Sequence, residues 1–133
     1  GSAAAAKLFA FLEWEEQEVV AAAFLDSGHR LIAVREIFRG TVAESIAQPR
    51  EILREALRLN AVKFLVAHNH VSRNTLPSPQ DVRFTVRMEW AADAVGLPML
   101  DHLILARGEN YFSFAEAKLL RKSSGPWRKR SFR

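Results

Sequence analysis

The sequence predicts an α/β or α+β fold in which a β-sheet is covered by helices. Apolar segments of strand length alternate along the chain with segments whose apolar residues recur at helical spacing. The chain has 133 residues, of which 49% are hydrophobic, and this is enough for one compact domain with its own core. We therefore expect a single domain without internal repeats.

The first half of the chain predicts two helices and two strands. A short helix over residues 5–16 has an apolar side formed by Leu8, Phe9 and Leu12. A buried strand over 18–25, a turn at 26–28 and a second strand over 30–38 follow, and Gly40 ends this pattern. Pro49 suits the first turn of the next helix. The apolar stripe of that helix consists of Ile52, Leu53, Ala56 and Leu57.

The second half begins with a strand over 62–67 that continues directly into His68-Asn69-His70. A loop over 71–77 leads to Ser78, which opens a long helix that Gly96 closes. Two strands, over 99–106 and 111–114, and a short final helix over 115–122 complete the predicted elements.

Composition excludes several classes of protein. The chain has no cysteine, which rules out disulfides and thiolate zinc sites, so any metal must be held by imidazole and carboxylate groups. No apolar run is long enough to span a bilayer, and residues 1–7 resemble a linker remnant rather than a signal peptide. A cytoplasmic protein that does not enter a membrane is the expectation.

The net charge of +4 is concentrated at the C-terminal end. Residues 121–133 contain six basic residues and no acidic one, so residues 1–120 carry 13 basic and 15 acidic groups, a net charge of −2. This distribution weakens the case for a nucleic-acid-binding core. It leaves a weak contact between the basic tail, residues 121–133, and DNA or another polyanion as an expectation.

Three residues in the second half predict a metal site. His68 and His70 are two apart at the end of a strand, so both side chains project from the same face. Asp81 lies in the first turn of the next helix, which the preceding loop can bring back over the strand end. Two histidines and one carboxylate suit zinc and leave a fourth position for water, as in catalytic zinc sites.

Each part of this pattern also has a purely structural explanation. Histidines at a strand end are as often hydrogen-bonded as bound to metal. Ser78 and Asp81 form a good capping box with Pro79 at the first helical position, so capping is the first explanation for either residue taken alone.

The complete string, H-x-H-x(7)-S-x(2)-D over residues 68–81, resembles the metal motif of the JAMM (MPN-plus) metallopeptidases, which include deubiquitinating isopeptidases. The chain is most similar to the bacterial RadC-like branch of that family over about residues 8–118. Further similarity lies at Asp26, Gly40-Thr41, Pro49-Arg50-Glu51-Ile52, Asp101-His102 and Ser113-Phe114. The resemblance implies a single α/β JAMM/MPN-like domain over residues 8–120, with a central mixed β-sheet flanked by helices in a cytidine-deaminase-like arrangement.

The same resemblance implies the roles of the site residues. His68, His70 and Asp81 would bind one Zn²⁺ per chain, and Ser78 would donate a hydrogen bond to the bound water or to the oxyanion. Glu18, directly before the first strand, matches the glutamate that acts as the general acid–base. The implied activity is zinc-dependent hydrolysis of a peptide or isopeptide bond in a protein substrate.

Two departures and two alternatives accompany the resemblance. Val71 and Arg73 replace a proline and a glycine that the family usually has beside the metal, which leaves the ligands but changes substrate access. The helix-hairpin-helix region of many RadC-like proteins does not occur in these 133 residues. The alternative functions are a non-enzymatic MPN-type binding module and an accessory domain in DNA repair.

We expect His102 to be bonded by backbone groups beside Asp101, although it could also orient a ligand. An oligomer is compatible with the sequence.

Overall fold

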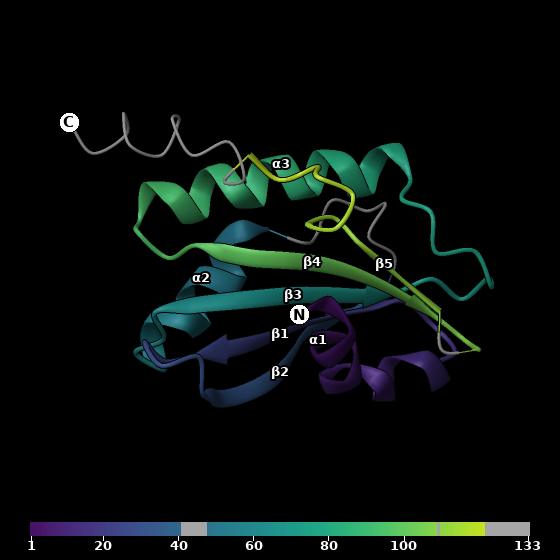
Figure 1. Ribbon diagram of the computed structural model, residues 1–133, viewed down its shortest axis with the longest axis horizontal. Coiled ribbons are helices and arrows are strands. Elements are labelled where there is room, and N and C mark those ends of the chain that lie inside the picture. Colours follow the sequence, from purple (N-terminus) through teal and green to yellow (C-terminus); the bar gives the residue numbers. More distant parts are fainter. Residues whose placement is uncertain (41–47, 109, 122–133) are drawn as a thin grey trace.

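The computed structural model describes residues 1–40, 48–108 and 110–121. Thr41 and residues 122–133, which figure in the predictions above, lie outside the described residues. Within the described part, five strands form one mixed sheet in the order β2-β1-β3-β4-β5 (Figure 1). The strands are β1 (Val19–Leu25), β2 (Leu31–Arg39), β3 (Lys63–Asn69), β4 (Met99–Ala106) and β5 (Asn110–Ser113). The predicted α/β fold with a central mixed sheet is confirmed.

The directions of the strands follow from their connections. β1 pairs in antiparallel fashion with both β2 and β3, and β4 pairs in the same way with β5. Only β3 and β4 are parallel, and the chain between them forms helix α3 (Pro79–Ala94). A parallel pair requires such a crossover. The N-terminus of α3 therefore lies at the end of the sheet where β3 ends.

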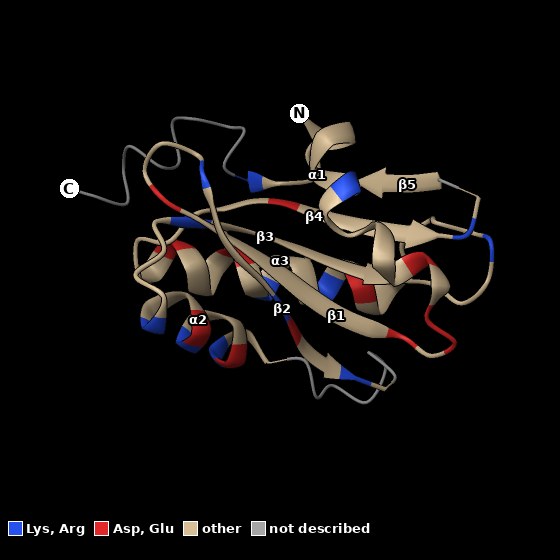
Figure 2. Ribbon diagram, turned by 90° about the horizontal axis from the view of Figure 1, so that it is seen from below, with Lys and Arg blue, Asp and Glu red and all other residues tan. Residues whose placement is uncertain are grey.

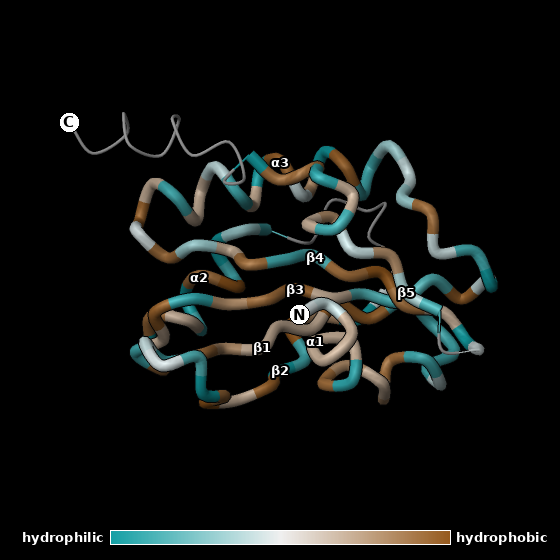
Figure 3. Tube along the Cα trace, in the orientation of Figure 1, coloured by the Kyte–Doolittle hydropathy of each residue, from teal (hydrophilic) through white to brown (hydrophobic). Residues whose placement is uncertain are grey.

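Helices cover both faces of the sheet. Helix α1 (Ser2–Leu8) and the 3₁₀ helix η1 (Ala10–Trp14) pack on one face, and α2 (Pro49–Arg58) and α3 pack on the other. In Figure 1, α1 lies in front of the strands and α2 behind them. The apolar residues follow the central strands (Figure 3), which separate two hydrophobic cores.

Strand alternation assigns side chains to these two cores. Phe64 and Val66 of β3 belong to the core beneath α2 and α3, whereas Leu65 and Ala67 belong to the core beneath α1 and η1. Because successive side chains on a strand point to opposite faces, His68 continues the series of Phe64 and Val66. It therefore faces α3. The alternation also directs Asn69 to the opposite face.

Both ends of α3 match the sequence signals. Ser78 is the N-cap in a capping box with Asp81, and Pro79 occupies the first turn. At the other end, Gly96 has a φ of 74°, and the Leu97 N–H bonds to the Ala92 carbonyl. This is a Schellman-type end, which needs a left-handed residue that glycine supplies without strain.

Two of the predicted helices are wrong in extent or kind. Residues 5–16 divide at Phe9 into α1 and η1, and the 3₁₀ turn brings Phe9 and Leu12, three residues apart, into the same core. In place of the predicted helix over 115–122, residues 115–118 form turns and residues 119–120 have no regular structure. Lys118 has a φ of 59°, which ends any right-handed helix after its first turn.

Charged residues of both signs lie on α2 (Figure 2). Arg54 pairs with Glu51 and Arg58 with Glu55, one turn apart on the exposed side of the helix. With Arg50, the helix has three basic and two acidic residues, a net charge of +1. No helix among the described residues is both long and apolar enough to cross a bilayer.

Candidate metal centre

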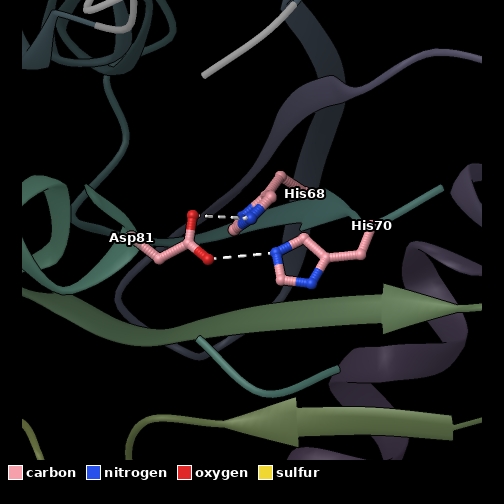
Figure 4. Close-up of side chains that lie close together, drawn as sticks. All are labelled: His68, His70 and Asp81. Atoms are coloured by element: carbon pink, nitrogen blue, oxygen red, sulfur yellow. Dashed lines mark hydrogen bonds and ion pairs between the residues drawn. The ribbon is translucent and has the colours of Figure 1, made fainter. Parts of the chain in front are cut away.

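The three predicted ligands meet where β3 ends beneath the start of α3. His68, on β3, and Asp81, at the third position of α3, are 2% and 3% exposed, and His70 follows β3 directly. One nitrogen of each imidazole and a carboxylate oxygen lie within 4.8 Å of one another, a group that could hold a metal ion. Figure 4 shows both rings turned toward the Asp81 carboxylate.

Each oxygen of the Asp81 carboxylate faces a different imidazole ring. Asp81 Oδ2 lies 3.0 Å from His70 Nε2, and Oδ1 lies 3.1 Å from His68 Nε2. The second pair does not have hydrogen-bond geometry, so His68 Nε2 is a buried nitrogen without a hydrogen-bond partner. A buried polar atom normally has a partner. Its direction toward Asp81 and His70 fits a metal ligand, and the nitrogen and oxygen donor set fits zinc.

The other ring nitrogens have partners of their own. His70 Nδ1 donates to the Asn74 carbonyl, 2.8 Å away, so the loop after β3 orients this ring. His68 Nδ1 lies 2.9 Å from Nε2 of His102. Both candidate ligands therefore present Nε2 to Asp81 and use Nδ1 for support, the arrangement usual for metal-binding histidines.

The same groups shift one another's pKa values in the metal-free chain. The hydrogen bond that His70 donates to the Asp81 carboxylate raises the pKa of His70 above its ordinary value, although burial opposes the shift. Burial alone would raise the pKa of Asp81, but its interactions with His68 and His70 outweigh this and hold the pKa well below its usual range. Asp81 is therefore ionised at neutral pH and available as a ligand.

Ser78 and Asp81 cap α3 and also belong to the site. The Ser78 hydroxyl oxygen accepts from the Asp81 N–H at 3.1 Å, and Asp81 Oδ2 accepts from the Ser78 N–H at 2.8 Å. Capping and membership of the site are thus not exclusive. The capping bonds hold the Asp81 carboxylate toward the end of β3, and the Ser78 hydroxyl retains its hydrogen for donation.

Glu18 lies beside this group rather than in it. β1 pairs with β3 in a register that sets Val20 opposite His68, and the same register continued by two residues sets Glu18 opposite His70. Glu18 is partly exposed, and its negative charge contributes to the raised pKa of His70. The register therefore places Glu18 next to the three candidate ligands without making it one of them.

Asn69, the residue between the two histidines, has a role that was not predicted from the sequence. Asn69 is 1% exposed, and its side-chain oxygen accepts from the Val19 N–H at 2.7 Å. Its amide nitrogen donates to the Gln17 carbonyl at 3.0 Å. These two bonds attach β3 to the main chain on both sides of Glu18. The only signal in the sequence was a polar residue in a buried strand end.

His102 contradicts the expectation that backbone groups would satisfy it. Its ring is completely buried, contacts His68 through Nε2 and lies 2.6 Å from Thr85 Oγ1 through Nδ1. Burial lowers the pKa of His102 well below its usual value, and the neighbouring His68 adds to the effect. His29 is exposed in a turn, and Val71 and Arg73 are exposed in the loop after His70.

Comparison with known proteins agrees with this geometry. The family described as "RadC-like JAB domain" matches residues 2–119. The chain is 46% identical over 107 residues to a UPF0758 protein of Actinobacillus pleuropneumoniae, a match that covers 80% of this chain and 48% of that protein. It is 44% identical over 118 residues to a UPF0758 protein of Trichormus variabilis, covering 89% and 48%. The chain thus spans about half the length of these relatives.

The match extends over most of the chain and includes β3 and α3, which carry the metal centre. The five-stranded mixed sheet with helices on both faces is consistent with a JAB/MPN fold. The chain belongs to the RadC-like JAB domain family.

Proposed function

We propose that this domain is a zinc-dependent hydrolase of the JAMM type, which adds water across an amide bond of a peptide or isopeptide-linked protein. The observation that carries the proposal is the convergence of His68 Nε2, His70 Nε2 and the Asp81 carboxylate, with His68 Nε2 buried and lacking a hydrogen-bond partner. A purely structural histidine pair would not require such an atom.

His68, His70 and Asp81 would hold the metal. When bound, zinc would act as a Lewis acid, lowering the pKa of a coordinated water and polarising the substrate carbonyl. The protein contributes the rigidity of the ligands, because two of them are buried and all three have supporting hydrogen bonds.

Glu18 and Ser78 would perform the proton transfer and the charge stabilisation. Glu18 would accept a proton from the attacking water while the water oxygen bonds to the carbonyl carbon of the substrate. It would then pass this proton to the leaving nitrogen as the carbon–nitrogen bond breaks. Ser78 would donate its free hydroxyl hydrogen to the carbonyl oxygen, where negative charge develops.

Metal content tests the first part of the proposal. Elemental analysis of protein purified without chelator or metal-affinity tag should find one zinc per chain, and His68→Ala and Asp81→Ala should lose it. His29→Ala is the matched control, since the His29 ring is exposed and lies 3.1 Å from Nζ of Lys63, at the opposite end of β3 from the candidate ligands. Equal zinc in all four proteins would refute the assigned ligands. A folded wild type without zinc would favour the binding module.

Hydrolysis tests the second part. A screen of peptides and ubiquitin-like conjugates should yield a substrate, on which Glu18→Gln should lower turnover about 10²–10⁴-fold while keeping the zinc. The amide has the shape of the carboxylate but cannot transfer the proton. Glu16→Gln, at an exposed position two residues away, is the control. Full turnover by Glu18→Gln would move the role to another residue, with Glu16 the next candidate.

A further inference from the structure

His102 occupies a buried position one strand away from the metal centre. It lies on β4, in the parallel pair in which Val66 is its register partner and His68 is that of Ile104. One face of its ring stacks on Phe114, with centroids 4.8 Å apart and planes 4° apart, and Phe84 meets the ring edge-on at 5.6 Å. Both ring nitrogens face polar groups, Thr85 on α3 and His68 on β3. Packing alone would not require both of these contacts.

The direction of each hydrogen bond follows from Thr85. Its hydroxyl donates to the Asp81 carbonyl, 2.7 Å away and one turn earlier in α3. A hydroxyl has one hydrogen, so Thr85 Oγ1 can only accept at its other contact, and His102 Nδ1 must donate to it. A neutral imidazole carries one N–H, which leaves His102 Nε2 as an acceptor. A charged ring enclosed by phenylalanines would be costly.

The same reasoning determines the tautomer of His68. Because His102 Nε2 is an acceptor 2.9 Å away, His68 Nδ1 must carry the hydrogen. In a neutral His68 the lone pair is then on Nε2, the buried atom that faces Asp81 without a hydrogen-bond partner. A metal requires that lone pair. The bonds run from His68 through His102 and Thr85 to the main chain of Asp81, and so connect two of the candidate ligands.

We infer that His102 is a positioning residue, which holds His68 in the tautomer that binds metal through a hydrogen-bond chain directed by Thr85. The inference rests on the proposed metal centre, because metal binding is the property that the tautomer serves. His70 obtains the same tautomer from a backbone carbonyl, that of Asn74. His68 lies within the sheet and reaches a side chain on the neighbouring strand instead.

Side-chain ¹⁵N NMR of the histidines, in both metal-free and zinc-loaded protein, tests the direction of the hydrogen bonds from His68 through His102 to Thr85. In the wild type, His102 should be the Nδ1–H tautomer and His68 should carry a hydrogen on Nδ1. Thr85→Val keeps the shape of the side chain but removes the acceptor. His102 should then move its hydrogen to Nε2, since a buried Nδ1–H would have no partner. A wild-type His102 found as the Nε2–H tautomer or doubly protonated, or one unchanged by Thr85→Val, would overturn the inference.

Zinc affinity, measured by competition with a chromophoric chelator, tests whether the selected tautomer of His68 strengthens metal binding. His102→Phe keeps the aromatic ring but removes both nitrogens, and should weaken binding about 10–100-fold, as is typical when such a supporting partner is lost. His102→Gln should recover much of the affinity, because its carboxamide oxygen can accept from His68 Nδ1. Phe84→Leu disturbs the packing of the same ring without removing a hydrogen bond, and should bind zinc nearly as the wild type does.

Equal affinities in His102→Phe and the wild type, or equal losses in His102→Phe and Phe84→Leu, would contradict the positioning role. If His102→Phe does not fold, the comparison of His102→Gln with Phe84→Leu and the tautomers in Thr85→Val still decide it. A wild type that binds no zinc would refute the proposed function and the metal's part in this inference. The tautomers would show separately whether the hydrogen-bond chain runs in the stated direction.

Discussion

Replacement of Asn69 by alanine should detach the segment that carries Glu18 from the end of β3. Asn69 accepts from the Val19 N–H and donates to the Gln17 carbonyl, and these groups lie on the two peptide units that flank Glu18. Val19 is completely buried, so its N–H would have no replacement partner, whereas Gln17 is exposed and its carbonyl can bond to water. The first loss should therefore dominate.

The expected loss of stability follows from that difference. An unsatisfied buried N–H costs about 1–3 kcal/mol, and a carbonyl that water can reach adds little. We expect the free energy of unfolding to fall by about 2 kcal/mol, which corresponds to roughly a 30-fold change in an equilibrium constant. Amide exchange at Val19 should accelerate by about this factor, because its 2.7 Å bond to Asn69 is lost.

Urea unfolding and hydrogen-exchange NMR measure these two quantities. Leu25→Ala is the control, because Leu25 is a buried residue at the other end of β1, and its truncation should cost about 2–5 kcal/mol without touching the site. Both variants should retain zinc, but only Asn69→Ala should lose turnover on a substrate that the wild type cleaves. Unchanged exchange at Val19, or equal losses of turnover in the two variants at matched folded fractions, would refute the reasoning.

Three further predictions concern the loop, the pH dependence and the tail. Arg73→Gly should change kcat/KM without changing zinc content, because Arg73 is exposed beside His70, where its guanidinium can narrow the site or bind a substrate carboxylate. Identical kinetics on several substrates would show that the side chain has no role. The rise in Tm on adding zinc should be larger at pH 8 than at pH 6. Because the pKa of His70 is raised, its ion pair with Asp81 stabilises the zinc-free protein fully below about pH 6.5, and this stabilisation is lost as the pH rises through the raised pKa. The deprotonated His70 ring is then free to bind zinc. An equal rise at both pH values would exclude this competition. Deletion of residues 122–133 should remove any salt-sensitive DNA binding and leave zinc content intact. Arg121 is kept because its N–H bonds to Glu89 and its guanidinium lies 3.7 Å from the Trp90 ring centre. Undiminished DNA binding by the shortened chain would place that contact on the domain.

Much of the fold could be predicted from local patterns in the sequence. The apolar runs predicted every strand, and proline and glycine marked the ends of α3 correctly, because hydrophobic periodicity and special backbone conformations are local properties. The final helix was wrong for a reason that is not local. After one turn Lys118 adopts a left-handed conformation, and beyond it Leu120 packs into the core beneath α2 and α3 while the Arg121 N–H bonds to Glu89 of α3.

The candidate ligands could also be named in advance, because the spacing of His68 and His70 places both on one strand face and the family motif adds Asp81. The support around them could not. His102 follows His68 by 34 residues and Asn69 follows Val19 by 50, and each pair meets only because β3 lies between β4 and β1. The sequence by itself determined which side chains can bind a metal. Only the tertiary structure decided which nitrogen each histidine presents, because the hydrogen-bond partners that select a tautomer come from neighbouring strands and from α3.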